Sequence, residues 1–285
     1  MITVFTPTYN RAYTLNNLYQ SLLKQTNYDF EWIIVDDGST DNTADLVMDF
    51  KKCSNLQFKI NYVYQENAGK HVAINTGVSL AKGDYFFIVD SDDYLREDAI
   101  SIIDKELSKI DQNSNLCGIV ALRCYKDGSV IGGNDSVLEI ETDFLSYRTK
   151  YKIRGDRAEI IKTSILKNYP FPYFENEKFC TEAVVWNRIA QKYNARFLAL
   201  PIYICEYLEG GLTKSAKKMF CNNPRGMQLY YKELFFYDVP LLTKIKAGIN
   251  CWKYWFMAKD IEKIQFSRIY LYLVIGWLLY KISKV

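Results

Sequence analysis

Apolar runs and amphipathic segments alternate along the first hundred residues of the chain. The apolar runs have the length and composition of buried strands, and they cover residues 2–6, 31–35, 58–64 and 85–89. Between them, apolar positions recur at helical spacing in residues 15–23, 44–50 and 72–80. Strands that alternate with helices at this pace predict a mostly parallel sheet that helices cover on both faces.

The alternation weakens in the next hundred residues. A strand-like run covers residues 118–125, and a turn follows at residues 126–129. Pro170 and Pro172 then interrupt the chain before a helical segment at residues 181–192, which carries an apolar face. These features predict a second half in which strands and helices are mixed less regularly.

Aromatic and basic residues become frequent beyond residues 215–225, where we place a functional boundary. In residues 241–257, apolar positions recur at helical spacing with lysines nearby. Residues 269–280 form an apolar and aromatic run between Arg268 and Lys281. As a helix this run would extend about 18 Å, against roughly 30 Å of bilayer hydrocarbon. We therefore expect a helix at a membrane surface; a lid on the rest of the chain or a homodimer contact is the alternative.

Composition narrows the class of protein. A chain of 285 residues with 49% hydrophobic residues can bury a core and is not disordered. The net charge of +3 gives no reason to expect a nucleic-acid partner. The seven cysteines are odd in number and lack CxxC spacing, so they predict neither a zinc site nor a disulfide framework. The N-terminus shows no export signal pattern, so we expect a cytoplasmic location.

An acidic cluster follows the strand of residues 85–89. The segment GDYFFIVDSDDYL runs directly into Asp90, Asp92 and Asp93. Carboxylate oxygens at this density suit Mg²⁺ or Mn²⁺, which in nucleotide enzymes commonly also binds substrate phosphates. The alternative is a solvated loop in which Asp92 or Asp93 caps a helix that begins near Glu97. Neither GxGxxG nor GxxxxGK[ST] is present, so phosphate binding must use other groups.

Several motifs in order along the chain resemble the family 2 glycosyltransferases of the GT-A fold. The N-terminal ones are TPTYNR at residues 6–11, VDDGSTDNT at 35–43, ENAGKHVAINTG at 66–77 and the acidic cluster. Further on, GDRAEI at residues 155–160, FCTEAVVWNRIA at 179–190 and EYLEGGLTKS at 206–215 are similar to bacterial polysaccharide-assembling members. The family uses nucleotide-sugar donors and usually inverts the anomeric centre.

The resemblance implies an α/β fold of the GT-A type, with a mostly parallel, Rossmann-like central sheet and a helical C-terminal appendage. Residues 1–215 would form the catalytic domain. Within it, residues 1–110 would bind the nucleotide sugar and residues 111–215 would face the acceptor. Residues 216–285 would form the helical, aromatic and basic region.

The resemblance assigns Pro7, Tyr9 and Asp37 to the nucleotide base, with Asp37 accepting a hydrogen bond from a uracil-type N–H. Arg11 closes the same TPTYNR motif and is expected to bind the donor. For Asp37 the alternative is formation of the turn before Gly38.

Lys70, His71 and Asn75 lie at or near the start of a predicted helix, where a cation and exposed N–H groups suit a diphosphate. His71 is the sole histidine, and without a second His or Cys at ligand spacing we expect a nucleotide or packing contact, not metal ligation. For Asn75, contact with the donor and a buried amide paired with loop backbone are both open.

The resemblance makes the acidic cluster the DxD-type motif of the family. Asp90 and Asp92 would bridge the ribose and the metal, and Asp93 would supplement or replace one of these contacts. The predicted metal ligands are Asp92 and Asp93, and the cofactor is Mn²⁺ or Mg²⁺. The ion would stabilise the negative charge that grows on the departing diphosphate.

An inverting transfer needs a base for the acceptor hydroxyl, and Glu182 is the candidate. Many relatives carry an acidic pair here, whereas this chain has Glu182 followed by Ala183. The alternative is that Glu182 is a first-turn helix acid after a Thr181 cap. Glu175 and Glu177 are reserve candidates that we expect to be surface charges.

Together these features predict a metal-dependent inverting glycosyltransferase with a UDP-linked donor and a glycan or lipid-linked acceptor, acting in surface-polysaccharide synthesis. The expected location is peripheral, at the cytoplasmic face of the bacterial inner membrane, with the C-terminal helices on the membrane surface. A nucleotide-sugar sensor without catalysis and a metal-dependent nucleotidyltransferase are the alternatives. A nucleotidyltransferase would use acidic metal chemistry similar to that of a glycosyltransferase. It usually also needs a phosphate-cradling loop, which the sequence lacks.

Overall fold

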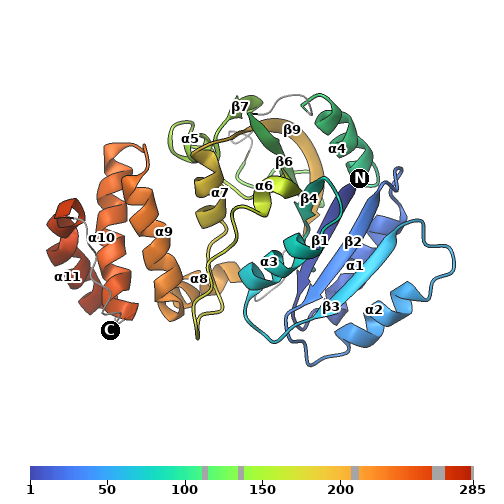
Figure 1. Cartoon of the computed structure of the whole chain (residues 1–285), viewed down its shortest axis with the longest axis horizontal. Helices are drawn as coiled ribbons and strands as arrows, with labels where there is room; N and C mark the ends of the chain where they lie inside the picture. The colour runs from blue at the N-terminus through green and yellow to red at the C-terminus, as the bar shows by residue number, and fades with distance from the viewer. Residues whose placement is uncertain (111–114, 134–137, 207–211, 259–266, 284–285) are drawn as a thin grey trace.

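The computed structural model describes residues 1–110, 115–133, 138–206, 212–258 and 267–283. These residues form a central sheet with helices on both faces and a group of helices at one end (Figure 1). The strands are β1 (Ile2–Thr8), β2 (Phe30–Asp36), β3 (Lys59–Tyr64), β4 (Tyr85–Ile88), β5 (Asp93–Leu95), β6 (Leu116–Tyr125), β7 (Ile140–Thr142), β8 (Arg157–Lys162) and β9 (Asn194–Cys205).

The sheet is parallel in its first half and mixed in its second, as the sequence predicts. Its strand order is β3-β2-β1-β4-β8-β6-β9-β5, and β7 pairs with β9. Strands β1 to β4 are mutually parallel, whereas β8 runs antiparallel to both β4 and β6. The carboxyl ends of β1, β2 and β4 therefore meet at one edge, which is where open sheets of this type bind ligands.

Helices cover both faces of the sheet and bury a separate apolar core on each. One core packs α1 (Ala12–Leu23), α2 (Thr43–Lys51) and α4 (Ala99–Ser108) on the strands. The other packs α3 (Lys70–Leu80), α5 (Phe144–Thr149), α6 (Thr163–Leu166) and α7 (Ala183–Ala190). Alternate residues of β1 supply both cores, since Val4 belongs to the first and Phe5 to the second.

The acidic cluster does not cap a helix. Asp93 begins the short strand β5, and Asp98 occupies the N-cap position of α4. The capping alternative for Asp92 and Asp93 is therefore wrong, because pairing of β5 with β9 separates the cluster from α4.

The C-terminal region is helical, as predicted, and lies at the end of the molecule opposite β3 (Figure 1). It contains α8 (Leu212–Asn222), α9 (Pro224–Phe236), α10 (Leu241–Ala258), the 3₁₀ helix η2 (Ser267–Tyr272) and α11 (Leu273–Ser283). The apolar run of residues 269–280 is thus divided between η2 and α11. Within the described residues, every helix is too short or too polar to cross a membrane. The predicted boundary between residues 215 and 216 falls inside α8 and stays a prediction.

Polar contacts bind helix α9 to the segment that leads into α7. Buried Glu177 accepts hydrogen bonds from the N–H groups of Arg225 (2.7 Å) and Gly226 (2.9 Å) in the first turn of α9. The Asn223 Oδ1 atom accepts from the N–H groups of Lys178 and Phe179, at 2.8 and 3.0 Å. The expectation that Glu177 is a surface charge is wrong, because the positive end of the α9 dipole and the N–H groups of its first turn hold this carboxylate.

A second link joins the helices themselves. Arg188 of α7 donates to both carboxylate oxygens of Glu233 on α9, with Nη2 at 2.7 Å from Oε1 and Nε at 3.1 Å from Oε2. Bidentate pairs of this kind fix orientation as well as distance. Helix α9 therefore helps to set the position of α7, and the residue just before α7 is Glu182.

We expect Glu177→Gln to lower the free energy of unfolding by about 1–3 kcal/mol, since the amide loses the charge that two backbone N–H groups and the α9 dipole stabilise. Urea unfolding followed by circular dichroism measures this change. The control is Glu175→Gln, an exposed neighbour, which should stay within about 0.5 kcal/mol of the wild type. Equal stability of the two variants would contradict the role of Glu177.

Candidate active site

The loops after β1 and β2 are hydrogen-bonded to each other. Asn10 adopts a left-handed conformation with φ of 52°. Its side-chain Oδ1 accepts from the N–H groups of Thr40 (2.8 Å) and Asp41 (3.3 Å), and its own N–H donates to Ser39 Oγ at 2.8 Å. This arrangement fixes the next residue, Arg11, whose Nη2 lies 3.8 Å from Asp92 Oδ2.

The three residues assigned to the nucleotide base differ in exposure. Pro7 is buried in β1 opposite Val35, whereas Tyr9 is 49% exposed. Asp37 is buried, and its carboxylate accepts from Gln65 Nε2 (2.7 Å), Ala68 N–H (2.9 Å) and Gly69 N–H (2.8 Å). A carboxylate offers about four lone-pair positions, so about one remains for a base N–H. The observed bonds give Asp37 a structural role, which is to hold the turn that leads into α3.

That turn brings the start of α3 against the segment before α7. Gly69 has φ of 98°, and a Cβ atom at this position would lie 2.1 Å from the carbonyl oxygen of Lys178. Only glycine allows both this conformation and this approach. Lys70, the first residue of α3, is thereby placed next to the N-terminus of α7.

His71 and Asn75 face inward from α3. His71 is 2% exposed, and within the described residues neither of its ring nitrogens has a hydrogen-bond partner. Burial lowers the pKa of His71, so its ring is neutral. The Asn75 side chain donates to the Phe171 carbonyl at 2.9 Å and accepts from the Phe171 N–H at 2.8 Å. This pairing favours the buried-amide alternative for Asn75 over contact with the donor.

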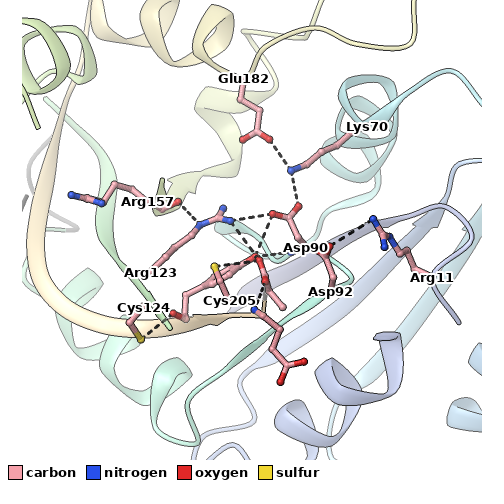
Figure 2. Close-up of polar contacts among 12 residues, drawn as sticks. Arg11, Lys70, Asp90, Asp92, Arg123, Cys124, Arg157, Glu182 and Cys205 are labelled. Carbon is pink, nitrogen blue, oxygen red and sulfur yellow. Dashed lines mark hydrogen bonds and ion pairs between the residues drawn. The ribbon is translucent and has the colours of Figure 1, made fainter. Parts of the chain in front are cut away.

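Lys70 joins the acidic cluster to α7. Its Nζ atom lies 2.6 Å from Asp90 Oδ1 and 2.8 Å from Glu182 Oε1. Figure 2 shows Lys70 between these two side chains, with a dashed line to each. Burial alone would lower the pKa of Lys70, but the two carboxylates raise it above its usual value. Burial alone would raise the pKa of Asp90, but Lys70 and then Arg123 hold it below its usual value. Lys70 and Asp90 are therefore both charged across the neutral range.

Arg123, a buried residue that the sequence analysis missed, contacts the acidic cluster from its buried side. Arg123 Nη1 lies 3.1 Å from Asp90 Oδ2, and the guanidinium carbon lies 4.2 Å from the centroid of the Tyr203 ring. The Tyr203 hydroxyl accepts from the Asp90 N–H at 2.9 Å and donates to Asp93 Oδ2 at 2.8 Å. The signal in the sequence was an arginine inside the otherwise apolar strand of residues 118–125, since such a charge needs a partner.

The acids at positions 92 and 93 occupy different surroundings. The Asp93 oxygens accept from Tyr203 and, at 3.2 Å, from the N–H of Glu206. Burial and then the nearby Asp90 charge raise the pKa of Asp93 to about 7. These bonds do not favour the predicted role of Asp93 as a metal ligand. Residues 207–211, which continue the EYLEGGLTKS motif, lie outside the described residues.

Asp92 is the carboxylate of the cluster with room for a ligand. Its side chain is 30% exposed, and it forms an ion pair with Arg11 at the long distance of 3.8 Å. The described residues contain no group of three or more His, Cys, Asp or Glu side chains placed to hold a metal. One partly exposed carboxylate suits a hard divalent ion only where substrate phosphates supply further oxygen ligands, as is common for Mg²⁺.

A second group that the sequence analysis missed is the Glu159 carboxylate on β8, inside the GDRAEI motif. Burial raises the pKa of Glu159 to about 7; the charge of Arg123 opposes this effect and that of Glu182 adds to it. A titratable group of this kind beside the predicted base is a functional candidate.

The chain matches a family model described as "Glycosyl transferase family 2" over residues 3–163. Glycosyltransferase GlyG of Streptococcus pneumoniae serotype 4 is 38% identical over 112 residues, which cover 39% of this chain and 36% of that protein. Chondroitin synthase of Pasteurella multocida is 37% identical over 109 residues, which cover 38% of this chain and 11% of that protein. The matched segment thus spans little more than a third, or less, of these relatives.

Two solved structures share the fold along most of the chain. TarS of S. aureus, solved in complex with UDP-GlcNAc, has a TM-score of 0.61 at 21% identity and covers 96% of this chain and 79% of its own. The mannosyltransferase PcManGT of Pyrobaculum calidifontis, solved with GDP-Man and Mn²⁺, has a TM-score of 0.60 at 16% identity. The match covers 100% of this chain and 88% of that one. These likenesses confirm the predicted α/β fold of the GT-A class.

Proposed function

Because this chain belongs to glycosyl transferase family 2, we propose that it inverts the anomeric centre while it transfers a sugar from a UDP-linked donor. The acceptor is a glycan or a lipid-linked sugar of a surface polysaccharide. The observation that carries the proposal is the ion pair of Lys70 with both Asp90 and Glu182. It brings the predicted donor-binding acids and the predicted base into one site.

The donor occupies the edge of the sheet formed by the loops after β1, β2 and β4. Tyr9 offers an exposed aromatic surface for the base, and Arg11 and Lys70 supply positive charge for the diphosphate. TarS, which shares the fold, was solved with UDP-GlcNAc, and this supports a nucleotide-sugar donor here. The matched synthases and transferases support a polysaccharide product.

Asp92 is the residue that would hold the divalent ion, Mn²⁺ or Mg²⁺, together with the donor diphosphate. Such an ion supplies electrostatic stabilisation of the departing diphosphate. PcManGT and a glucosyl-3-phosphoglycerate synthase of Mycobacterium tuberculosis were both solved with Mn²⁺ and a nucleotide, which supports this choice. Arg123 and Tyr203 keep Asp90 in place for the ribose, since both are buried and bonded to it.

Glu182 accepts the proton of the acceptor hydroxyl. The hydroxyl oxygen forms a bond to the anomeric carbon of the sugar while the bond from that carbon to the diphosphate oxygen breaks, and the nucleoside diphosphate leaves with the electron pair. Before this step Lys70 neutralises Glu182 at 2.8 Å. The donor diphosphate competes for the Lys70 ammonium, and this competition frees the Glu182 carboxylate for general-base work.

Glu182→Gln should reduce the transfer rate by about 10²- to 10⁴-fold and leave donor affinity nearly unchanged, because the amide keeps the shape but accepts no proton at neutral pH. The measurements are calorimetry with UDP-sugars and a transfer assay once an acceptor is found. Glu175→Gln is the matched control. Near-normal turnover in Glu182→Gln would remove Glu182 as the base, and a wild type that binds donor but never transfers would favour the sensor alternative.

Asp92→Asn should weaken the Mn²⁺-dependent affinity for UDP by about 10- to 100-fold, since a neutral amide replaces the charged ligand. Calorimetry with UDP in Mn²⁺ and in EDTA measures this effect. Asp104→Asn, an exposed position on α4, serves as the control. If the wild type binds UDP and transfers equally well in EDTA, the metal mechanism is wrong.

Helix α11 places the protein on the cytoplasmic face of the membrane. Val274, Ile275, Leu278 and Ile282 recur at helical spacing and are between 47% and 70% exposed. Trp277 and Lys281 lie beside them, and such aromatic and basic groups suit the headgroup level. A surface location also suits a lipid-linked acceptor.

The double variant Val274→Glu with Leu278→Glu should bind anionic liposomes more than about tenfold more weakly, because each buried apolar side chain contributes about 1.5–3 kcal/mol. Cosedimentation measures the bound fraction, and donor affinity should not change. Met48→Glu on α2 is the control, since Met48 is 43% exposed and far from α11 in sequence. A wild type that stays in the supernatant would favour the lid or dimer alternative.

A further inference from the structure

Glu159 lies in the centre of the sheet, on a strand that is hydrogen-bonded to a neighbouring strand on each side. Strand β8 runs between β4 and β6, and Glu159 pairs with Val120 of β6. The residues on either side of it, Ala158 and Ile160, belong to the core under α1, α2 and α4. Because side chains alternate along a strand, Glu159 points to the other face, together with Ile161 of the second core.

No described residue donates a hydrogen bond to the Glu159 carboxylate or forms an ion pair with it. The Glu159 side chain is only partly buried, and its oxygens are not fully enclosed. A half-buried carboxylate without a partner is costly. Such a group is retained at this cost where a ligand supplies the missing hydrogen bonds.

Glu159 lies on the face of the sheet that α3 and α7 cover, where Lys70 is the first residue of α3 and Glu182 directly precedes α7. Arg123 and Glu182 are the two charged groups with the largest electrostatic effect on it. Arg123 contacts Asp90 on the donor side, and Glu182 is the proposed base. A donor sugar must extend from the diphosphate at Lys70 and Asp92 to the point where Glu182 meets the acceptor. The Glu159 side chain is on the sheet face that these two helices, α3 and α7, cover.

We infer that Glu159 binds ring hydroxyl groups of the donor sugar and thereby determines which sugar is transferred. A carboxylate can accept hydrogen bonds from two adjacent hydroxyl groups, and a site built in this way rejects a sugar whose hydroxyl points elsewhere. The inference rests on the proposed function, and it assigns the sugar specificity of that same site.

The test compares binding of UDP with that of UDP-glucose, UDP-galactose and UDP-N-acetylglucosamine, by calorimetry in Mn²⁺. In the wild type, the best of the three sugars should bind more tightly than UDP. In Glu159→Gln, we expect the affinity for that sugar nucleotide to fall by about 10- to 100-fold, the range for a lost hydrogen bond to a charged group. The affinity for UDP should change less than about twofold, and the preference among the three sugars should narrow.

Two controls separate this result from misfolding. Glu141→Gln alters an exposed glutamate on β7 and should leave all four affinities unchanged. Glu159→Gln removes a half-buried charge, so its thermal midpoint should equal or exceed that of the wild type.

Three outcomes overturn the inference while leaving the proposed function in place. In the first, the wild type binds UDP but binds none of the three UDP-sugars more tightly than UDP. In the second, Glu159→Gln keeps full affinity for the preferred UDP-sugar. In the third, Glu159→Gln loses equal affinity for UDP and for that UDP-sugar. A fall in turnover with unchanged donor affinity would instead make Glu159 a proton acceptor and also overturn it. A wild type that binds none of these nucleotides would refute the proposed function, and the inference with it.

Discussion

The site depends on one cation held between two acids. Lys70 contacts Asp90 and Glu182 at once, and these two carboxylates come from segments more than ninety residues apart. Without the ammonium, the acids would repel each other in a partly buried region where charge is poorly screened. The ion pair therefore holds the loop after β4 and the start of α7 together. In the proposed function, the donor diphosphate would offer Lys70 a third anionic partner.

The position of α7 is set from outside the central sheet. Glu177 and Arg188 bind α9 on either side of Glu182, through N–H groups in the first turn of α9 and through a bidentate pair with Glu233. The C-terminal helices are therefore connected to the site and are more than an appendage. Attachment of α11 to a membrane would hold the same helical group in place, so the location of the acceptor and the geometry of the base are joined through α9.

The charged groups behind the site explain why one acid can take a ligand and others cannot. Arg123 and Tyr203 bind Asp90 and Asp93 from the buried side, which leaves Asp92 as the acid of the cluster that can meet a metal. Glu159, near Arg123 but without a bonded partner among the described residues, is the acid that we infer binds the sugar. The proposed division of these carboxylates among structural, metal and sugar roles rests on their surroundings, since burial and neighbouring charges decide protonation and access.

The sequence by itself determined the alternation of strands and helices, the parallel first half of the sheet and the loops that would meet at its edge. These features follow from local periodicity and from the rule that parallel strands end together. Tertiary structure alone decided which polar side chains have partners. Glu177 looks like a surface charge in the sequence, yet it is buried under α9, and Asp37 and Asn75 use their oxygens on backbone N–H groups brought from elsewhere. Arg123 and Glu159 acquired their surroundings only when β6 and β8 paired in the centre of the sheet. A residue type fixes what a group can bind, but contacts between distant segments fix whether its lone pairs are already used, because burial removes water as the alternative partner.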